Sequence, residues 1–230
     1  MGKCKFLNKS IIAHRGIYNN ITIYENSLDA IMYAVKNNLS VSIDVRCTND
    51  EIIVFSDKYG TRFLKLKDDI NTLSKEELDY ISNYNIPKLV DVLNSVNGRV
   101  PILINIYYDD KVFRNKLINI LDKYKGMFVL LSDSYEIIKH YKKKKYNVGL
   151  IINDSNIKYL DRSYDVDVLN IKYNLLDKRE VNVLKDKYYV IASVIDNRKD
   201  AEYFIKIYNN LIIDNVEEIF KWKQIKRDLL

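Results

Sequence analysis

Eight short apolar runs recur along this 230-residue chain, and most are separated by a stretch with helical periodicity. Near-continuous apolar strands that alternate with amphipathic helices are typical of a parallel sheet covered on both faces. Eight such units predict an α/β fold, a single (β/α)8 TIM barrel over residues 1–230, with functional groups at the C-terminal ends of the strands. The predicted strands cover residues 11–14, 41–46, 102–107, 127–132, 147–152, 168–171, 189–194 and 211–213.

Apolar spacing and capping residues predict the helices. Residues 25–38 form the first, and its core-facing stripe is expected to consist of Leu28, Ile31, Met32 and Val35. Ser74-Lys75-Glu76-Glu77 is a capping box that starts a short helix. An added strand is expected over residues 51–55, and further helices over residues 87–96, 110–124, 134–144, 177–187, 198–208 and 216–227.

Charge and cysteine usage exclude several classes of protein. The net charge is +6, but acidic residues are interspersed with basic ones and no nucleic-acid motif is present, so we expect no nucleic-acid partner. Cys4 and Cys47 lack a metal-type spacing, which predicts free thiols and a cytoplasmic location. The opening residues lack a signal-like segment, and no apolar run approaches the length of a membrane span.

Two surface features leave a peripheral role open. Residues 142–145 are four lysines in a row, which favours a solvated loop over a patch for acidic lipids. The apolar residues of the last predicted helix favour packing against the barrel over a membrane or dimer contact. We therefore do not expect peripheral membrane contact, and the oligomeric state stays open.

The stretch Ile11-Ile12-Ala13-His14-Arg15-Gly16 ends a predicted strand with reactive groups. His14 is one of two histidines, the residue type most suited to acid–base chemistry at neutral pH. The forked donors of Arg15 suit a phosphate, and Gly16 lets the chain turn. His140 lies in a lysine-rich helix end, where we assign it no catalytic role.

Three later segments extend this signal: Glu25-Asn26-Ser27, Ser42-Ile43-Asp44-Val45 and Phe55-Ser56-Asp57. In order and spacing the four segments resemble the glycerophosphodiester phosphodiesterase family, whose pattern is His-Arg-Gly, Glu-Asn-Thr/Ser, Glu-Leu/Ile-Asp-Val and His-Asp. The resemblance continues through residues 86–89 and 102–106 and more weakly covers the whole chain. It implies a TIM barrel and a phosphoric diester hydrolase of lipid metabolism, with two catalytic histidines and a divalent cation, calcium or magnesium.

The resemblance assigns roles to four retained residues. His14 matches the first catalytic histidine, and Arg15 matches the arginine that contacts phosphate. Glu25 matches the glutamate of the Glu-Asn motif, and Asp44 matches one metal ligand. Purely structural roles remain open: Arg15 and Glu25 as an ion pair across the first loop, and Asp44 as a partner of Arg15 or Arg46.

Four other functional positions are changed. Ser42 and Asn105 stand where the family has acidic metal ligands, Ser56 stands at the second catalytic histidine, and Tyr107 replaces a lysine. Hard divalent cations prefer several carboxylate ligands, so their affinity should fall steeply. A serine hydroxyl does not titrate near neutral pH and cannot replace the histidine. A shifted register on the third strand would instead bring Asp109 or Asp110 to a ligand position.

We therefore predict a degenerate member of the family, a pseudoenzyme that is inactive or strongly impaired. We expect no tightly bound cofactor and at most weak binding of calcium or magnesium. The expected partner is a phosphate-bearing small molecule or a protein, bound through His14, Arg15, Asp44 and Ser56, with Glu25 and Tyr107 as further contacts. Two alternatives stay open: an active hydrolase or lyase that uses His14, and a structural role in an assembly.

Overall fold

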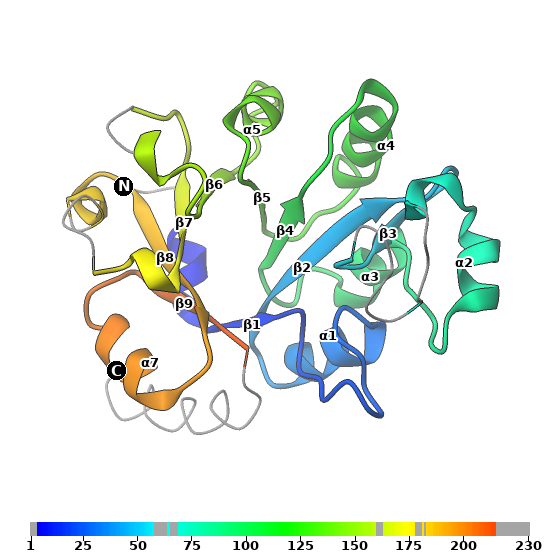
Figure 1. The fold of residues 1–230 in the computed structure, drawn as a ribbon, viewed down its shortest axis with the longest axis horizontal. Coiled ribbons are helices and arrows are strands. Elements are labelled where there is room, and N and C mark those ends of the chain that lie inside the picture. Colours follow the sequence, from blue (N-terminus) through cyan, green and yellow to red (C-terminus); the bar gives the residue numbers. More distant parts are fainter. Residues whose placement is uncertain are drawn as a thin grey trace. The chain divides into compact units, whose positions relative to one another are not determined.

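The structure is a computed structural model that describes residues 4–57, 64, 69–159, 163–177, 181 and 183–214. The fold class is the (β/α)8 TIM barrel, as the eight apolar runs predict, with one added antiparallel strand. Figure 1 labels the strands and helices along the chain. The chain divides into two compact units, one of Met1–His14 with Phe128–Leu230 and one of Arg15–Met127. That residues 1–230 act as one domain stays a prediction.

In the unit Arg15–Met127, three strands lie side by side. Strand β2 (Ser40–Cys47) pairs in parallel with β4 (Ile102–Ile106) and antiparallel with β3 (Ile52–Val54). The parallel register sets Asp44 opposite Asn105. Because both strands are buried along most of their length, their few polar side chains must find partners inside the protein.

The helices of this unit are α1 (Leu28–Lys36), α2 (Lys75–Ile81), α3 (Leu89–Val96) and α4 (Lys111–Leu121), with the 3-10 turn η2 (Ile70–Thr72). The capping box predicted for α2 is present, since Ser74 and Glu77 bond each other's backbone N–H. The predicted capping box is thus confirmed. In α3 the apolar side chains of Leu89, Val92, Leu93 and Val96 are buried, and the helix ends at Asn97 in a left-handed conformation.

Helix α1 differs from its prediction in start and in face. It begins at Leu28 instead of residue 25, because Asn26 has a positive φ of 59° and the Ser27 side chain caps the first turn. Leu28 and Met32 are only half-buried. The buried face consists of Ala30, Ile31, Ala34 and Val35, so it includes two alanines that the sequence pattern had not placed there.

Helix α3 begins two residues later than predicted. Pro87 does not open it, because the Pro87 carbonyl accepts a hydrogen bond from the Val54 N–H. Lys88 forms an isolated bridge with Ile53 and is the N-cap residue. The backbone before the helix therefore remains extended and continues the pairing of β3.

The other unit contains six parallel strands in the order β1-β9-β8-β7-β6-β5. Their bounds are β1 (Ile12–His14), β5 (Phe128–Ser132), β6 (Val148–Ile152), β7 (Val168–Lys172), β8 (Tyr189–Ile195) and β9 (Asn210–Ile213). Across both units, each predicted barrel strand agrees with the structure to within one residue at either end.

The helical segments of this unit are α5 (Tyr135–Lys142) and α7 (Arg198–Phe204), with the 3-10 turns η1 (Lys5–Lys9), η3 (Ile157–Tyr159), η4 (Tyr173–Leu175) and η5 (Leu184–Asp186). The helix predicted over 177–187 is a 3-10 turn at its end, while residues 178–180 and 182 lie outside the described residues. The predicted helix 216–227 also lies outside them. Within the described part of the chain, no helix is long and apolar enough to cross a membrane.

Candidate functional site

The carboxylate of Asp44 lies at the centre of a polar cluster in the unit Arg15–Met127, and its side chain is 0% exposed. Its Oδ1 accepts hydrogen bonds from Asn105 Nδ2 at 3.0 Å and from the Tyr107 hydroxyl at 2.8 Å. Its Oδ2 lies 2.7 Å from Arg15 Nε and accepts from Asn26 Nδ2 at 3.1 Å. Three protein hydrogen bonds and the Arg15 ion pair therefore engage both oxygens of this carboxylate.

Arg15 is fixed by its backbone and by two carboxylates. Its φ is 59°, its N–H donates to the Ser42 carbonyl at 2.7 Å, and its carbonyl accepts from Asn26. Its Nη1 donates to Glu25 Oε1 at 2.7 Å. Burial alone lowers the pKa of the guanidinium, but Asp44 and Glu25 raise that pKa above its ordinary value. The structural ion pairs that the sequence left open are thus confirmed.

Gly16 makes the sharp turn after Arg15, with a φ of 89°. A Cβ atom at this position would lie 2.5 Å from the Ala30 carbonyl carbon, on the backbone of α1. The glycine of the His-Arg-Gly motif is therefore required both by its conformation and by the close approach of the first helix.

Ser56, at the position of the family's second catalytic histidine, joins the cluster through Glu25. Its hydroxyl donates to Glu25 Oε1 at 2.7 Å, and its carbonyl accepts from Arg46 Nη2 at 3.0 Å. The Arg46 guanidinium lies 4.5 Å from the centre of the Tyr107 ring, a cation–π distance. Sequence reasoning gave Arg46 only a possible contact with Asp44. Its position two residues beyond Asp44 on the same strand face was the available signal.

Two buried polar atoms of the cluster have neither a hydrogen bond nor an ion pair among the described residues: the donor Nε of Arg46 and the acceptor Oδ1 of Asn105. The Asn105 amide is oriented by its Nδ2, which faces both Asp44 Oδ1 and Ser42 Oγ. Unpaired buried polar atoms are uncommon in folded proteins and call for a water or ligand partner.

Tyr107 supplies a neutral donor where a lysine was expected. Its hydroxyl lies against the fully buried Asp44, although the residue as a whole is 39% exposed. Burial, and then the charge of Asp44, raise the pKa of Tyr107 above its ordinary value. The phenol therefore keeps its proton and donates to Asp44 at physiological pH.

The register of β4 places Asn105, and not Asp109 or Asp110, opposite Asp44. Asn105 reaches Asp44, whereas Asp109 forms an ion pair with Arg114. Asp110 is the N-cap of α4 and accepts from the Phe113 N–H at 2.7 Å. Both carboxylates thus have structural roles at the start of α4.

His14 ends β1 and belongs to the other unit, where its partner is Asp214. His14 Nδ1 and Asp214 Oδ1 are 3.0 Å apart. Sequence reasoning missed Asp214, although it is the first polar residue after the last apolar run, where a barrel presents functional groups. A carboxylate at Nδ1 orients an imidazole so that Nε2 is left for chemistry.

The residues around Asp44 do not fit a divalent cation. Calcium takes six to eight oxygen ligands and magnesium requires six, usually with several carboxylates. Here the strand positions offer one carboxylate, already held by three hydrogen bonds and the Arg15 ion pair, and the neutral Ser42 and Asn105. No group of three or more His, Cys, Asp or Glu side chains within the described residues is arranged to hold a metal ion.

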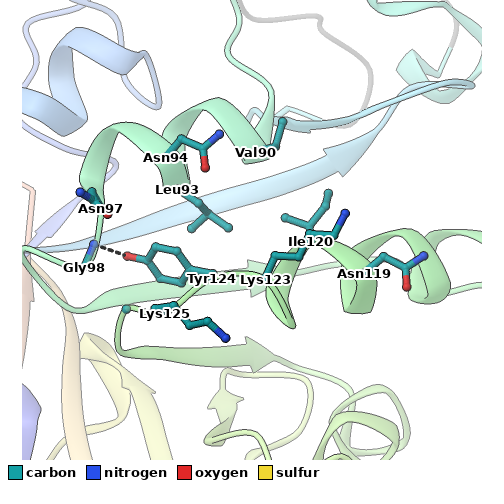
Figure 2. A pocket seen from close by; sticks show the side chains of 11 residues that line it. Val90, Leu93, Asn94, Asn97, Gly98, Asn119, Ile120, Lys123, Tyr124 and Lys125 are labelled. Carbon is teal, nitrogen blue, oxygen red and sulfur yellow. Dashed lines mark hydrogen bonds between the residues drawn. The ribbon is translucent and has the colours of Figure 1, made fainter.

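The cavities of the unit Arg15–Met127 include two that differ in their relation to the Asp44 cluster. One, of about 260 Å³, is lined by Arg46 and Tyr107 together with Cys47, Asp69, Asn71 and apolar neighbours. The other, of about 780 Å³, lies between the ends of α3 and α4, where the Tyr124 hydroxyl accepts from the Gly98 N–H (Figure 2). Only the smaller cavity contains residues of the Asp44 cluster.

The fold and the order of the polar residues along the chain define a TIM-barrel protein of the phosphodiesterase kind. The model of the glycerophosphoryl diester phosphodiesterase family matches residues 14–170, which is more than half of the chain. The chain therefore belongs to the glycerophosphoryl diester phosphodiesterase family. None of the curated protein sequences matches it significantly.

Solved structures of the same fold resemble the chain over nearly its whole length. A glycerophosphodiester phosphodiesterase from Thermotoga maritima is 22% identical with a TM-score of 0.79, covering 92% of this chain and 96% of that one. An Oleispira antarctica phosphodiesterase in complex with the product sn-glycerol-3-phosphate is 18% identical with a TM-score of 0.76, covering 92% and 95%. A Parabacteroides distasonis glycerophosphodiester phosphodiesterase is 18% identical with a TM-score of 0.75, covering 95% and 98%.

Proposed function

We propose that this chain is a family member that has lost metal-assisted hydrolysis of glycerophosphodiesters and binds a small phosphate ester instead. The hydrogen bond from Ser56 Oγ to Glu25 Oε1 carries the proposal. Hydrolysis needs one group to assist attack on phosphorus and another to protonate the leaving oxygen. At the second of these positions the chain has a hydroxyl that does not titrate near neutral pH and already donates to a carboxylate.

The unpaired atoms of the cluster support the binding part of the proposal. Arg46 Nε is a buried donor for a phosphate oxygen, and Asn105 Oδ1 is a buried acceptor for a ligand hydroxyl. A phosphate ester that carries hydroxyl groups offers both complements. The Oleispira antarctica phosphodiesterase, whose structure contains sn-glycerol-3-phosphate, supports this class of ligand by analogy of fold.

Hydrolysis is tested directly on the purified protein. Glycerophosphocholine and bis-p-nitrophenyl phosphate are offered with calcium, magnesium, manganese or a chelator. We expect turnover at least about a hundredfold below that of the Thermotoga maritima enzyme, since each lost acid–base group costs about 10²–10⁴-fold. Turnover within tenfold of that enzyme, abolished in His14→Ala, contradicts the proposal.

Binding is tested by calorimetry with sn-glycerol 3-phosphate and inorganic phosphate. Arg46→Gln should weaken binding at least about tenfold, because a charge-assisted hydrogen bond contributes about 1.5–3 kcal/mol. Arg198→Gln, which changes an exposed arginine of α7 paired with Glu202, is the matched control and should bind like the wild type. Equal weakening in both variants, or no binding by the wild type, contradicts the proposal.

A second candidate function is supported by the pair of His14 and Asp214. With Asp214 at Nδ1, the imidazole has the arrangement of a general base whose cationic form is stabilised by a carboxylate. The candidate is an active hydrolase or lyase that relies on this one histidine. It predicts chelator-resistant turnover that disappears in His14→Ala and falls in Asp214→Asn, whereas the first proposal predicts no turnover to lose.

A further inference from the structure

We infer that the Arg15 guanidinium takes the electrostatic place of a divalent cation in this chain, so that the Asp44 cluster is complete without metal. The inference rests on the proposed function only for the position of the site. It concerns the charge balance around Asp44, not the ligand. Its basis is how the two oxygens of Asp44 are bonded.

The oxygens of Asp44 are already engaged by protein groups. A cation at Asp44 needs oxygen lone pairs, yet Oδ1 is held by Asn105 and Tyr107, and Oδ2 by Arg15 and Asn26. The hydroxyl of Ser42 also receives a donor, Asn105 Nδ2. The buried oxygen left over is Asn105 Oδ1, a single neutral ligand. Each oxygen of Asp44 that a cation gained as a ligand would cost at least one of the charged contacts that this carboxylate now makes.

The charges of the Asp44 cluster are balanced without a metal ion. Arg15 contacts both Asp44 and Glu25, and Arg46 lies beside Tyr107, so two guanidinium groups balance two carboxylates in the cluster. A divalent cation would add two positive charges to a set that is already neutral. Buried charge without a counter-ion is strongly unfavourable. The Asp44 cluster thus selects against a metal on both grounds.

The Arg15 side chain is held firmly in place. Arg15 is held by its left-handed backbone, by two backbone hydrogen bonds and by two ion pairs, and its side chain is 19% exposed. A guanidinium with forked donors fixed in this way is a permanent internal cation. Unlike a bound metal ion, it is not removed by a chelator.

The experiment titrates manganese, calcium and magnesium into the wild type and into Arg15→Gln, with calorimetry and thermal unfolding as readouts. We expect no saturable binding and no change in melting temperature for the wild type, with or without chelator. Arg15→Gln leaves Asp44 and Glu25 without their shared cation. It should therefore bind manganese at least about tenfold more tightly than the wild type and be stabilised by it.

Arg114→Gln is the matched control, since Arg114 also pairs with a buried carboxylate, Asp109, in the same unit. It should gain no manganese binding, because Asp109 is not part of a two-carboxylate cluster around one cation. Should Arg15→Gln fail to fold, Ser42→Glu with Asn105→Glu supplies the missing carboxylates and should bind manganese by the same criterion.

Two results overturn the inference. One is wild-type binding of calcium, magnesium or manganese in the micromolar range that Asp44→Asn abolishes. The other is equal manganese binding by Arg15→Gln and Arg114→Gln. A wild type that binds metal yet hydrolyses nothing overturns this inference and leaves the proposed function standing. A wild type that binds no metal yet hydrolyses diesters contradicts the proposed function and leaves this inference standing.

Discussion

The Nε atom of Arg15 lies 2.7 Å from Oδ2 of Asp44, whose side chain is completely buried. This contact joins the end of the His-Arg motif to the middle of β2, and Glu25 extends it across the first loop. A buried carboxylate without a partner is costly. The stability of this unit therefore depends on the ion pair between Arg15 and Asp44.

The first prediction concerns this pair. Arg15→Ala should lower the free energy of unfolding by about 3–5 kcal/mol, because it leaves a buried charge uncompensated. Adding Asp44→Asn should recover part of that loss, since the uncompensated charge is removed. Urea unfolding measures both variants. Arg198→Ala, which breaks an exposed i,i+4 pair with Glu202, serves as the control and should cost about 0.3–0.5 kcal/mol.

The second prediction concerns the Tyr107 hydroxyl. Tyr107→Phe keeps the ring beside Arg46 but removes a donor to Asp44, so it should cost about 1.5–3 kcal/mol. Tyr108→Phe is the matched control, because its hydroxyl donates to Asp110 at the surface. We expect a clearly smaller change there. Equal losses of unfolding free energy in the two variants would show that the buried hydrogen bond of Tyr107 stabilises the fold no more than the surface bond of Tyr108.

The fold was predictable because its signals are local. Each apolar run is long enough to be a buried strand, and eight of them in alternation leave few architectures. The errors fall where a contact distant in sequence competes with local propensity. Pro87 was expected to open α3, but its carbonyl bonds the Val54 N–H of the neighbouring strand, which no helix rule contains.

The site was predictable in its members but not in its bonding. Motif spacing predicted the positions of Arg15, Glu25 and Asp44, and the structure brings them into contact. That Tyr107 would donate to Asp44 could not be foreseen, because its role depends on the register of β4 against β2. Asp214 was missed because it lies 200 residues from His14 and carries no motif of its own.

The third prediction tests the turn at Gly16. Gly16→Ala should cost about 2–5 kcal/mol, because the left-handed backbone disfavours a side chain and the new Cβ would overlap the backbone of Ala30. Gly98→Ala is the control. Its φ is also positive, but its Cβ would lie 3.3 Å from Gly126 Cα. A smaller loss for Gly98→Ala in urea unfolding would separate crowding from conformation, and equal losses would contradict the crowding argument.

The fourth prediction concerns pH and the capping box of α2. Hydrogen bonds from the Ser74 backbone N–H, and then from its hydroxyl, lower the pKa of the Glu77 carboxyl below its ordinary 4.5. Its stabilising contribution is therefore fully present above pH 4.5 and is lost as the pH falls through the lower folded-state pKa. Urea unfolding of the wild type and Glu77→Gln should differ at neutral pH and converge in acid. Glu76→Gln, next to it, should show no such convergence.

The fifth prediction concerns alkaline pH and Tyr208, whose hydroxyl donates to the Leu176 carbonyl at 2.7 Å. Burial, and then the nearby Asp177, raise the pKa of Tyr208 from 10.0 to about 12. The folded state therefore keeps this proton where the unfolded state releases it. Tyr208 stabilises the fold fully below pH 10, and that contribution is lost as the pH rises from 10 to about 12.

Tyr208→Phe isolates this contribution from that of other tyrosines. Burial also raises the pKa of Tyr107 and Tyr189, so the wild type should lose stability above pH 10 for more than one reason. In urea unfolding, Tyr208→Phe should lose less stability than the wild type between pH 10 and 12, because one titrating group has been removed. Tyr80→Phe changes an exposed ring on α2 and should follow the wild type. Parallel curves for wild type and Tyr208→Phe would mean that the Tyr208 proton is not linked to folding.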